Sequence, residues 1–150
     1  MAGNSRLATA IHVAGMISFA EKMPITSETI AKSCNTNAVV IRRIIGQLTK
    51  GGLVEVKMGT GGGSRLTKKP EEITLAEIYE ALEEGSVFEV PQFDEKHFCL
   101  VGKIVRPVLA EVLQQAEHTL VEHLAKTTLA DVIEKVKLKM HQNCIEVSNG

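Results

Sequence analysis

The residues with the clearest capacity for recognition chemistry lie in a glycine-rich stretch near the middle of the chain. Glycine lets a backbone approach a phosphate or enter a narrow groove where a Cβ would collide, and Lys or Arg beside it neutralise phosphate. A nucleotide-binding loop is a poorer explanation, because these glycines neither lead into a helix nor carry a G-K-[ST] ending. The stretch holds six of the twelve glycines and four basic residues, namely Gly51, Gly52, Gly59, Gly61, Gly62 and Gly63 with Lys57, Arg65, Lys68 and Lys69.

The cysteines and histidines show no pattern of a metal site or of a catalytic centre. Cys34, Cys99 and Cys144 are odd in number and far apart, and none forms a C-x-x-C or Cys/His pair with metal-finger spacing. The five histidines are scattered, and no nucleophile, base and orienting acid occur at a recognisable spacing. We therefore expect neither an enzyme nor a bound cofactor.

The composition supports one globular domain, or a small domain with an appendage, and its charge is divided between the two halves. Residues 1–70 hold ten Lys/Arg against three Asp/Glu, whereas residues 71–150 hold seven against fifteen. This asymmetry favours a basic half that faces a polyanion, although charges that cluster helix by helix would give it too. Aromatic residues are 3% of the chain, so base stacking is not expected. With no membrane-length apolar run and no signal peptide, the chain is predicted to be cytoplasmic, with no membrane partner.

Three predicted helices precede the glycine-rich stretch. The first covers residues 5–22 and ends before Pro24, the second covers 27–34, and the third covers 38–50 with Asn37 as its cap. Two short helices separated by a polar turn, with arginines early in the second, are typical of a helix-turn-helix. An ordinary helical hairpin in a bundle shows the same pattern. The inward stripe of the third helix is formed by Ile41, Ile44, Ile45 and Leu48.

The segment after these helices decides between the two interpretations. Residues 53–57 read as a strand, 58–64 as a glycine-rich tip and 65–69 as the returning strand. A helix-turn-helix followed directly by such a hairpin predicts a winged helix. The expected fold class is therefore mainly α with a small β-hairpin wing.

The second half is predicted to contain three more helices. Thr74 and Glu77 form a capping box that begins the first, and Gly85 ends it. The longest pattern, 97–126, has a wide apolar face and is interpreted as a dimerisation helix, with an intramolecular core helix as the alternative. Pro107 either kinks this helix or marks a fresh start. A second capping box, Thr128 to Asp131, opens the last helix.

These elements divide the chain into three expected units. Residues 5–85 form a winged helix-turn-helix domain, 86–140 a connector with the dimerisation helices, and 141–150 a flexible tail.

The stretches ETIAKSCNTNAVVIRRIIGQLTKGG and GLVEVKMGTGGGSRLTKKPEEITLAEIYEALE resemble the Rrf2 family of bacterial winged-helix regulators, the IscR, NsrR and CymR type. The likeness extends from about Arg6 to Met140. It implies a homodimeric transcription factor, usually a repressor, that binds a roughly palindromic operator in double-stranded DNA. The DNA-binding positions that it implies are Asn37, Ala38, Val39, Arg42 and Arg43 in the third helix and Lys57, Gly61, Gly62, Gly63 and Arg65 in the wing.

The chain departs from these relatives in its presumed DNA contacts. Many of them carry Arg directly before the wing glycine, where this chain has Met58, and relatives with Glu-Gln in the recognition helix differ from Arg42 and Arg43 here. Either arginine could read a guanine or hold a phosphate, the phosphate role being slightly favoured for Arg43. Both departures leave the operator sequence open.

A further departure concerns the sensor. Cluster-binding relatives carry three closely spaced cysteines before the long helix, but residues 86–106 contain only Cys99, so an iron–sulfur cluster is not expected. In a dimer, Cys34 could approach Cys99 of the other chain, and a disulfide there would change the half-site spacing. The alternatives are inert packing of both thiols, a regulator with a small-molecule or metal effector at the dimer interface, and a protein-interaction winged helix without a DNA target.

Overall fold

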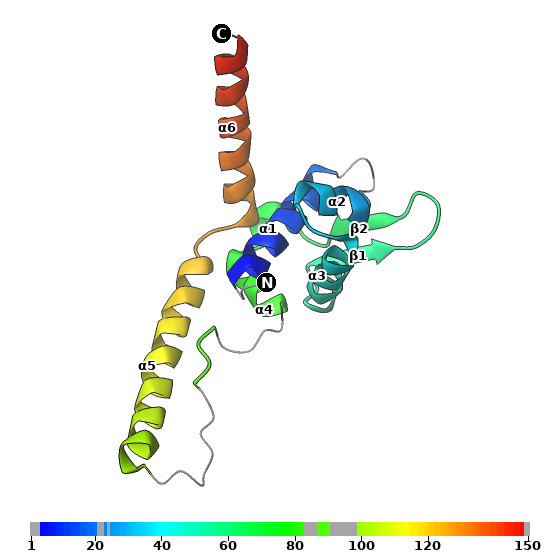
Figure 1. Cartoon of the computed structure of the whole chain (residues 1–150). Coiled ribbons are helices and arrows are strands. Elements are labelled where there is room, and N and C mark those ends of the chain that lie inside the picture. The colour runs from blue at the N-terminus through cyan, green and yellow to red at the C-terminus, as the bar shows by residue number, and fades with distance from the viewer. Residues whose placement is uncertain (1–3, 21–22, 24, 83–86, 91–98, 149–150) are drawn as a thin grey trace.

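The computed structural model describes residues 4–20, 23, 25–82, 87–90 and 99–148, with side chains described as far as residue 144. A compact head contains the first four helices and a hairpin, and two long helices extend from it in different directions (Figure 1). The elements in chain order are α1 (Asn4–Phe19), α2 (Ser27–Ser33), α3 (Ala38–Lys50), β1 (Val54–Lys57), β2 (Gly63–Leu66), the 3-10 turn η1 (Pro70–Glu72), α4 (Leu75–Ala81), α5 (Leu100–Leu124) and α6 (Leu129–Ser148).

The core of the head forms between α1, α2, α3 and α4, with the beginning of β1 closing one side. The stripe predicted for α3 is confirmed, since all four of its residues are buried. Leu129 and Ile133 at the start of α6 also join this core, although they follow the long helix in the sequence. Each such buried aliphatic side chain contributes about 1.5–3 kcal/mol. The head is therefore completed by residues from the second half of the chain.

The turn between α2 and α3 is fixed by backbone hydrogen bonds at the end of α2. Asn35 has a φ of +50°, a left-handed conformation that Asn tolerates well. The N–H of Thr36 donates to the carbonyl of Ala31 at 3.0 Å, and the N–H of Asn35 donates to that of Lys32 at 3.3 Å. This is a Schellman ending. It sets the direction in which α3 leaves the turn.

The same kind of ending connects α3 to the wing. Gly52 has a φ of +74°, and the N–H of Leu53 donates to the carbonyl of Leu48 at 2.9 Å. Both leucines are buried, which is the apolar contact that usually accompanies this motif. The position therefore favours glycine, and the turn directs β1 away from α3.

The wing is a two-stranded antiparallel hairpin in which Val54 pairs with Leu66 and Lys57 pairs with Gly63. The returning strand lies earlier than the predicted 65–69. It ends at Leu66 because the chain must curve into η1, whose first residue, Pro70, has no N–H to continue a ladder.

The helix α4 begins as predicted. The side chain of Thr74 accepts from the N–H of Glu77 at 3.2 Å, and the carboxylate of Glu77 accepts from the N–H of Thr74 at 2.9 Å. Ile73 and Ile78 at the two staple positions are fully buried. The helix ends at Ala81, earlier than the predicted end at Gly85, and residues 83–86 lie outside the described part of the chain.

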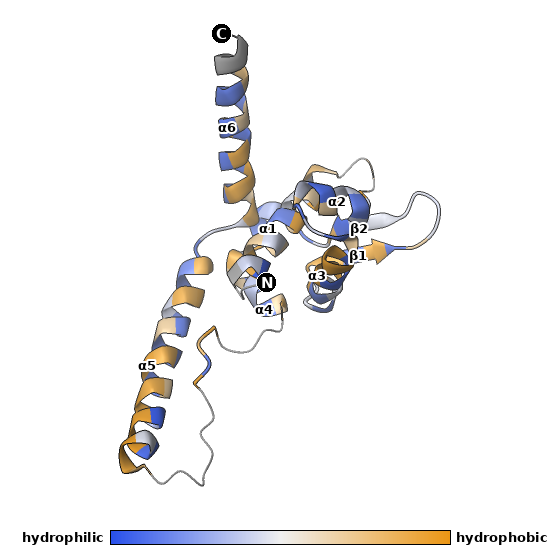
Figure 2. Ribbon diagram, viewed as in Figure 1, coloured by the Kyte–Doolittle hydropathy of each residue, from blue (hydrophilic) through white to orange (hydrophobic). Residues whose placement is uncertain are grey.

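The long helix α5 is continuous through Pro107. Residues 97–98 of the predicted 97–126 fall outside the described residues. No residue of α5 is buried within the chain, and one side of the helix is apolar along much of its length (Figure 2). The exposed apolar side chains are Leu100, Val101, Ile104, Val105, Val108, Leu109 and Val112, and we call this set the α5 face.

The last helix extends further than the sequence suggests. A flexible tail was expected over 141–150, but α6 remains helical to Ser148. Residues 141–148 contain neither Gly nor Pro, so nothing in them ends a helix. Whether this part moves in solution stays a prediction. Among the helices described here, none has the length and apolar character needed to cross a membrane.

Candidate nucleic-acid interface

The first turn of α3 presents a mixture of polar and apolar groups. The Oδ1 atom of Asn37 caps the helix by accepting from the N–H of Val40 at 3.0 Å. Ala38 is partly buried against the core, whereas Val39 is 70% exposed. Of these three predicted contact residues, Asn37 and Val39 therefore face outward, and Ala38 lies between the surface and the core.

The two arginines of α3 have different environments. Arg42 forms a hydrogen-bonded ion pair with Glu28 in the first turn of α2, which links its guanidinium to that helix. Arg43 is exposed and makes no hydrogen bond or ion pair to any other described residue. Glu28 is not among the residues that the sequence predicts to contact DNA. Its pairing with Arg42 was missed because the two residues are neighbours only after α2 and α3 have packed.

The wing carries its charges on one face. Glu55 pairs with Arg65 across the hairpin, and Lys57 lies two residues further along the same strand. Residues opposite each other, and residues two apart, share a face of a hairpin. Lys57 and Arg65 are exposed and have no ion-pair partner among the described residues, so both predicted basic positions of the wing are free to meet an anion.

The fold of the wing tip itself explains why glycine occupies these positions. Gly61 and Gly63 have φ values of +73° and +147°, where a side chain would be strained. At Gly62 an added Cβ would lie 2.2 Å from the carbonyl oxygen of Lys57. The tip therefore folds tightly only with glycine. A contact of these three residues with DNA stays a prediction.

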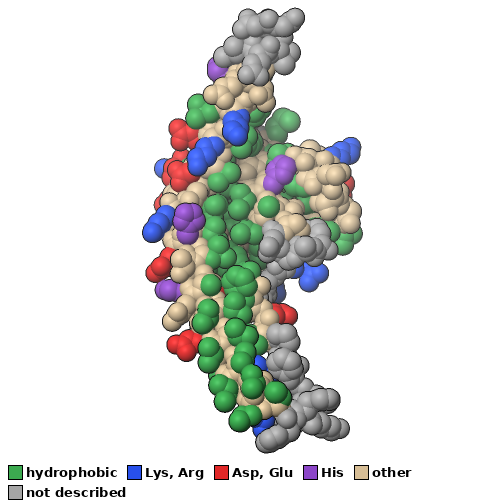
Figure 3. All heavy atoms as spheres, turned by 60° about the vertical axis from the view of Figure 1, so that its left-hand side comes forward, with side chains coloured by type: hydrophobic (Ala, Val, Ile, Leu, Met, Phe, Trp, Pro, Cys, Tyr) green, Lys and Arg blue, Asp and Glu red, His purple; other side chains and the backbone are tan. Residues whose placement is uncertain are grey.

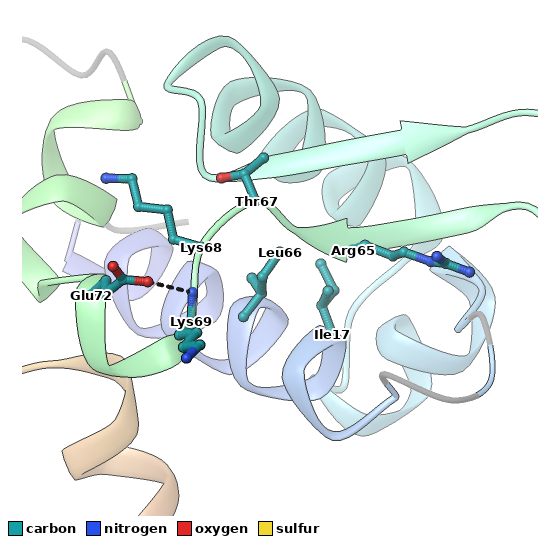
Figure 4. A pocket seen from close by; sticks show the side chains of 7 residues that line it. All are labelled: Ile17, Arg65, Leu66, Thr67, Lys68, Lys69 and Glu72. Carbon is teal, nitrogen blue, oxygen red and sulfur yellow. Dashed lines mark hydrogen bonds between the residues drawn. The ribbon is translucent and has the colours of Figure 1, made fainter.

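A surface pocket of about 470 Å³ lies at the base of the wing, between β2 and α1. Ile17 and Leu66 lie side by side in the middle of this pocket. Its three basic side chains, Arg65, Lys68 and Lys69, point in different directions (Figure 4). The Lys68 ammonium lies 2.6 Å from a carboxylate oxygen of Glu77. Because the charges diverge, the pocket is not a preformed site for a single anion. Its residues are Ile17, Arg65, Leu66, Thr67, Lys68, Lys69 and Glu72.

The two cysteines of the predicted switch lie on different elements. Cys34 ends α2 and is half-buried, whereas Cys99 is the exposed N-cap residue of α5. Burial raises the pKa of the Cys34 thiol above its ordinary value. Within one chain the start of α5 lies at the far end of that helix from the head that contains α2 (Figure 1). The structure therefore does not bring the two thiols together within one chain.

The described residues do not fit an iron–sulfur cluster or another metal centre. A cluster requires several thiolates that converge on its irons. The three cysteines belong to α2, to the start of α5 and to the distal part of α6. No group of three or more His, Cys, Asp or Glu in the described part of the chain could hold a metal ion.

The fold and this surface together define a winged helix-turn-helix DNA-binding protein. Comparison with known families gives the more specific assignment. Residues 4–135 match the Rrf2 family, described as iron-dependent transcriptional regulators, and the chain belongs to this family. It is thus a DNA-binding transcriptional regulator and not an enzyme, as the sequence predicted.

Individual relatives agree with this assignment. YwnA of Bacillus subtilis strain 168, described as an HTH-type transcriptional regulator, is 38% identical over 130 residues, covering 87% of this chain and 96% of YwnA. A crystal structure described as that of a DNA binding protein is 36% identical, with a TM-score of 0.68 over 85% of this chain and 98% of the other. CymR, described as the global cysteine regulator of B. subtilis, shares the fold with a TM-score of 0.62 at 23% identity, over 87% of this chain and 94% of CymR.

Proposed function

We propose that this regulator is a homodimeric repressor that binds a roughly palindromic operator in the bacterial cytoplasm through the first turn of α3 and the wing. The observation that carries the proposal is that Val39, Arg43, Lys57 and Arg65 are all exposed, and that the three basic residues among them form no ion pair with any described residue. Arg43 suits a phosphate, because its guanidinium is exposed and has no partner among the described residues. Arg42 suits a base edge, because Glu28 already holds it in one direction.

The dimer is supported by the α5 face. A row of apolar side chains gathers along the long helix on one side of the molecule (Figure 3). Monomeric soluble proteins rarely leave an apolar patch of this extent uncovered. A second copy placed against it by a two-fold axis would cover both faces at once, and it would present two reading heads to a palindrome.

We further propose that oxidation controls this dimer through Cys34 and Cys99 of the partner chain. A peroxide would oxidise the exposed Cys99 first. It would transfer one oxygen atom to the sulfur, which gives a sulfenic acid, and would itself be reduced to water or an alcohol. The Cys34 thiol would then attack that sulfur and release water, which forms the disulfide. The raised pKa of Cys34 supports this order, because a thiol that holds its proton is the slower of the two to react with the oxidant.

A specific feature also supports a small-molecule effector, at a place that no residue of the α5 face lines. A second surface pocket, of about 800 Å³, lies between the end of α1, η1 and the start of α6. At the edge of this pocket, the Lys137 ammonium lies 5.6 Å from the centre of the Phe19 ring. Because this pocket adjoins η1, a ligand there could move the base of the wing without any thiol chemistry.

The proposals are tested by fluorescence anisotropy with a labelled duplex from the region upstream of the chain's own gene. Arg43→Ala should weaken binding and lower the salt dependence by about one phosphate contact. Lys135→Ala, an exposed basic residue on α6, is the matched control and should leave binding unchanged. Equal binding by wild type and Arg43→Ala would contradict the assigned role of α3.

The redox part needs its own comparison. Oxidised wild type should release the duplex and run as a covalent dimer without reductant. Cys34→Ser and Cys99→Ser should abolish both effects, whereas Cys144→Ser should behave as wild type. Oxidation that leaves binding unchanged would overturn the thiol switch and leave the effector alternative. Failure of reduced wild type to bind at low salt would instead favour a protein-interaction role.

A further inference from the structure

The wing has two chemically different faces. Along β1 the residues alternate between the apolar Val54 and Val56 and the charged Glu55 and Lys57, and Met58 follows directly after the end of the strand. Successive side chains of a strand point to opposite faces, so each set lies on one face. Arg65, opposite Glu55, adds to the charged face. The hairpin therefore has one face that suits phosphate and one that does not.

The apolar face becomes progressively more exposed toward the tip. Val54 is 2% exposed and belongs to the core, Val56 is 47% exposed, and Met58 is 87% exposed. Across the hairpin, Val54 and Val56 are paired with Leu66 and Ser64. An apolar surface thus begins inside the head and ends in a methionine beside the glycines of the tip. This arrangement presents Met58 to whatever the tip contacts.

We propose that Met58, supported by Val56, is the contact of the wing with the minor groove of the operator, and that this contact is apolar. The inference rests on the proposed DNA-binding surface and adds to it how the wing reads DNA. Methionine is one of the side chains that proteins insert into a minor groove. Lys57 and Arg65 on the other face supply charge for the phosphates at the edge of the groove.

The shape of the tip supports DNA as the occupant. The minor groove of B-DNA is about 6 Å wide, and the tip, residues 59–63, consists of four glycines and Thr60, so only one side chain could obstruct its entry. Gly62 lies against the carbonyl of Lys57, with its N–H donating to the carbonyl of Gly59 at 3.0 Å. The two sides of the tip therefore lie close together, and Met58 directly precedes its first glycine.

An uncharged contact has a consequence for sequence preference. A cationic side chain in the minor groove selects narrow A·T tracts, whose negative potential is enhanced. Met58 carries no charge and cannot respond to that potential. The wing of this protein should therefore accept A·T and G·C pairs beneath it about equally.

The test compares two operator duplexes that have identical half-sites but carry either A·T or G·C pairs beneath the wings. Wild type should bind both with affinities within about twofold. Met58→Ala should weaken binding to both by about tenfold, the loss expected for one buried apolar side chain. Met58→Arg should bind the A·T duplex more tightly than the G·C duplex. Its binding constant should also fall more steeply with salt, by the amount expected for about one additional phosphate contact. Met140→Ala, an exposed methionine on α6, serves as the control.

The outcomes separate this inference from the proposed function. Wild-type binding that is lost in Arg43→Ala but unchanged in Met58→Ala would overturn the wing contact and leave the regulator intact. A strong A·T preference of wild type would overturn its apolar character. If Met58→Ala changed the oligomeric state and not the DNA affinity, the apolar face would belong to a protein interface. Absence of any wild-type binding would contradict the proposed operator itself.

Discussion

Thr74 and Thr128 form an isolated antiparallel bridge between the beginnings of two helices that are more than fifty positions apart in the sequence. The N–H of Leu75 donates to the carbonyl of Thr127 at 2.9 Å, and the N–H of Leu129 donates to the carbonyl of Ile73 at 2.8 Å. Each threonine also caps its own helix. The bridge therefore joins the start of α4 in the head to the start of α6, directly after the helix that carries the α5 face.

The first prediction concerns the cap at Thr128. Its hydroxyl accepts from the N–H of Asp131 at 3.2 Å, and Asp131 accepts from the N–H of Thr128 at 2.8 Å. Thr128→Ala removes the first of these bonds but leaves the backbone bridge intact, so unfolding should become easier by about 1 kcal/mol. Urea unfolding at one fixed protein concentration measures the loss, because a dimer would make stability depend on concentration.

The control for that experiment is Thr119→Ala. Thr119 lies within α5, and its hydroxyl donates to the carbonyl of Gln115, four residues earlier. Alanine has the higher helix propensity, so this change should be neutral or slightly stabilising. A Thr128 variant as stable as the Thr119 variant would show that the second capping box contributes nothing.

Both capping boxes could be predicted from the sequence, because four consecutive residues carry the entire signal. The bridge between Thr74 and Thr128 could not be predicted in this way. It depends on Ile73 and Leu129 burying their side chains in one core, and nothing local to either residue indicates the other. The ion pair between Glu28 and Arg42 could not be predicted for the same reason. The buried apolar stripe of α3, in contrast, follows from the helical periodicity of that segment alone.

The second prediction concerns acid stability. The ammonium of Lys68 foremost, and then the backbone N–H of Thr74, hold the pKa of Glu77 below its ordinary value of 4.5. A lowered folded pKa means that the stabilisation is complete above pH 4.5 and is lost as the pH falls through the lowered value. Glu77→Gln retains a capping-box residue but cannot titrate. Its free energy of unfolding should fall less steeply than that of wild type below about pH 4.5.

Urea unfolding over a series of pH values measures this difference. Glu122→Gln removes an exposed carboxylate on α5 that lies beside His118, and it should retain the acid sensitivity of wild type. Parallel pH profiles for wild type and Glu77→Gln would contradict the role of the Lys68 pair.

The third prediction compares two glycines. An added Cβ at Gly15 in α1 meets no atom within 4 Å, so Gly15→Ala should raise stability by about 0.5–1 kcal/mol. Gly62→Ala would bring its Cβ to 2.2 Å from a backbone oxygen, so the tip must rearrange. Because the tip is exposed, DNA affinity should fall more than stability does. Urea unfolding and anisotropy on the same two variants separate these effects.

The glycines also show what the sequence could and could not reveal. Their clustering predicted a hairpin tip, and the tip is present. The reason for each one differs, however, because left-handed φ angles and a close backbone approach depend on the three-dimensional path of the loop. Composition alone suggested a single reason, proximity to DNA.

The fourth prediction concerns the α5 face. Val108→Glu places a charge in the middle of this face, and burying an unpaired carboxylate between two chains is costly. The variant should elute as a monomer in size-exclusion chromatography with light scattering, with its helical content retained. Gln114→Glu adds the same charge to an exposed position on the opposite side of α5 and should remain dimeric. A dimeric Val108→Glu would remove the α5 face from the interface.

The last prediction uses the single tyrosine of the chain. The Tyr79 hydroxyl in α4 donates to the carboxylate of Glu117 in α5 at 2.7 Å. Burial first, and then the adjacent carboxylate, raise the pKa of Tyr79 from 10.0 to about 12. With no tryptophan and no second tyrosine, the ultraviolet absorbance of tyrosinate reports this one group directly. Its titration midpoint should lie near pH 12 in the folded protein, provided that circular dichroism confirms the fold at each pH.

The same pair links pH to the attachment of α5 to the head. A phenol whose folded pKa is raised adds stability that is complete below pH 10 and lost as the pH rises toward 12. Tyr79→Phe removes that dependence together with the hydrogen bond, at a cost of about 1 kcal/mol at neutral pH. Glu117→Gln keeps an acceptor without the charge and should return the tyrosine midpoint part of the way toward 10.0. A wild-type midpoint at the ordinary value would mean that α4 and α5 do not hold this contact in solution.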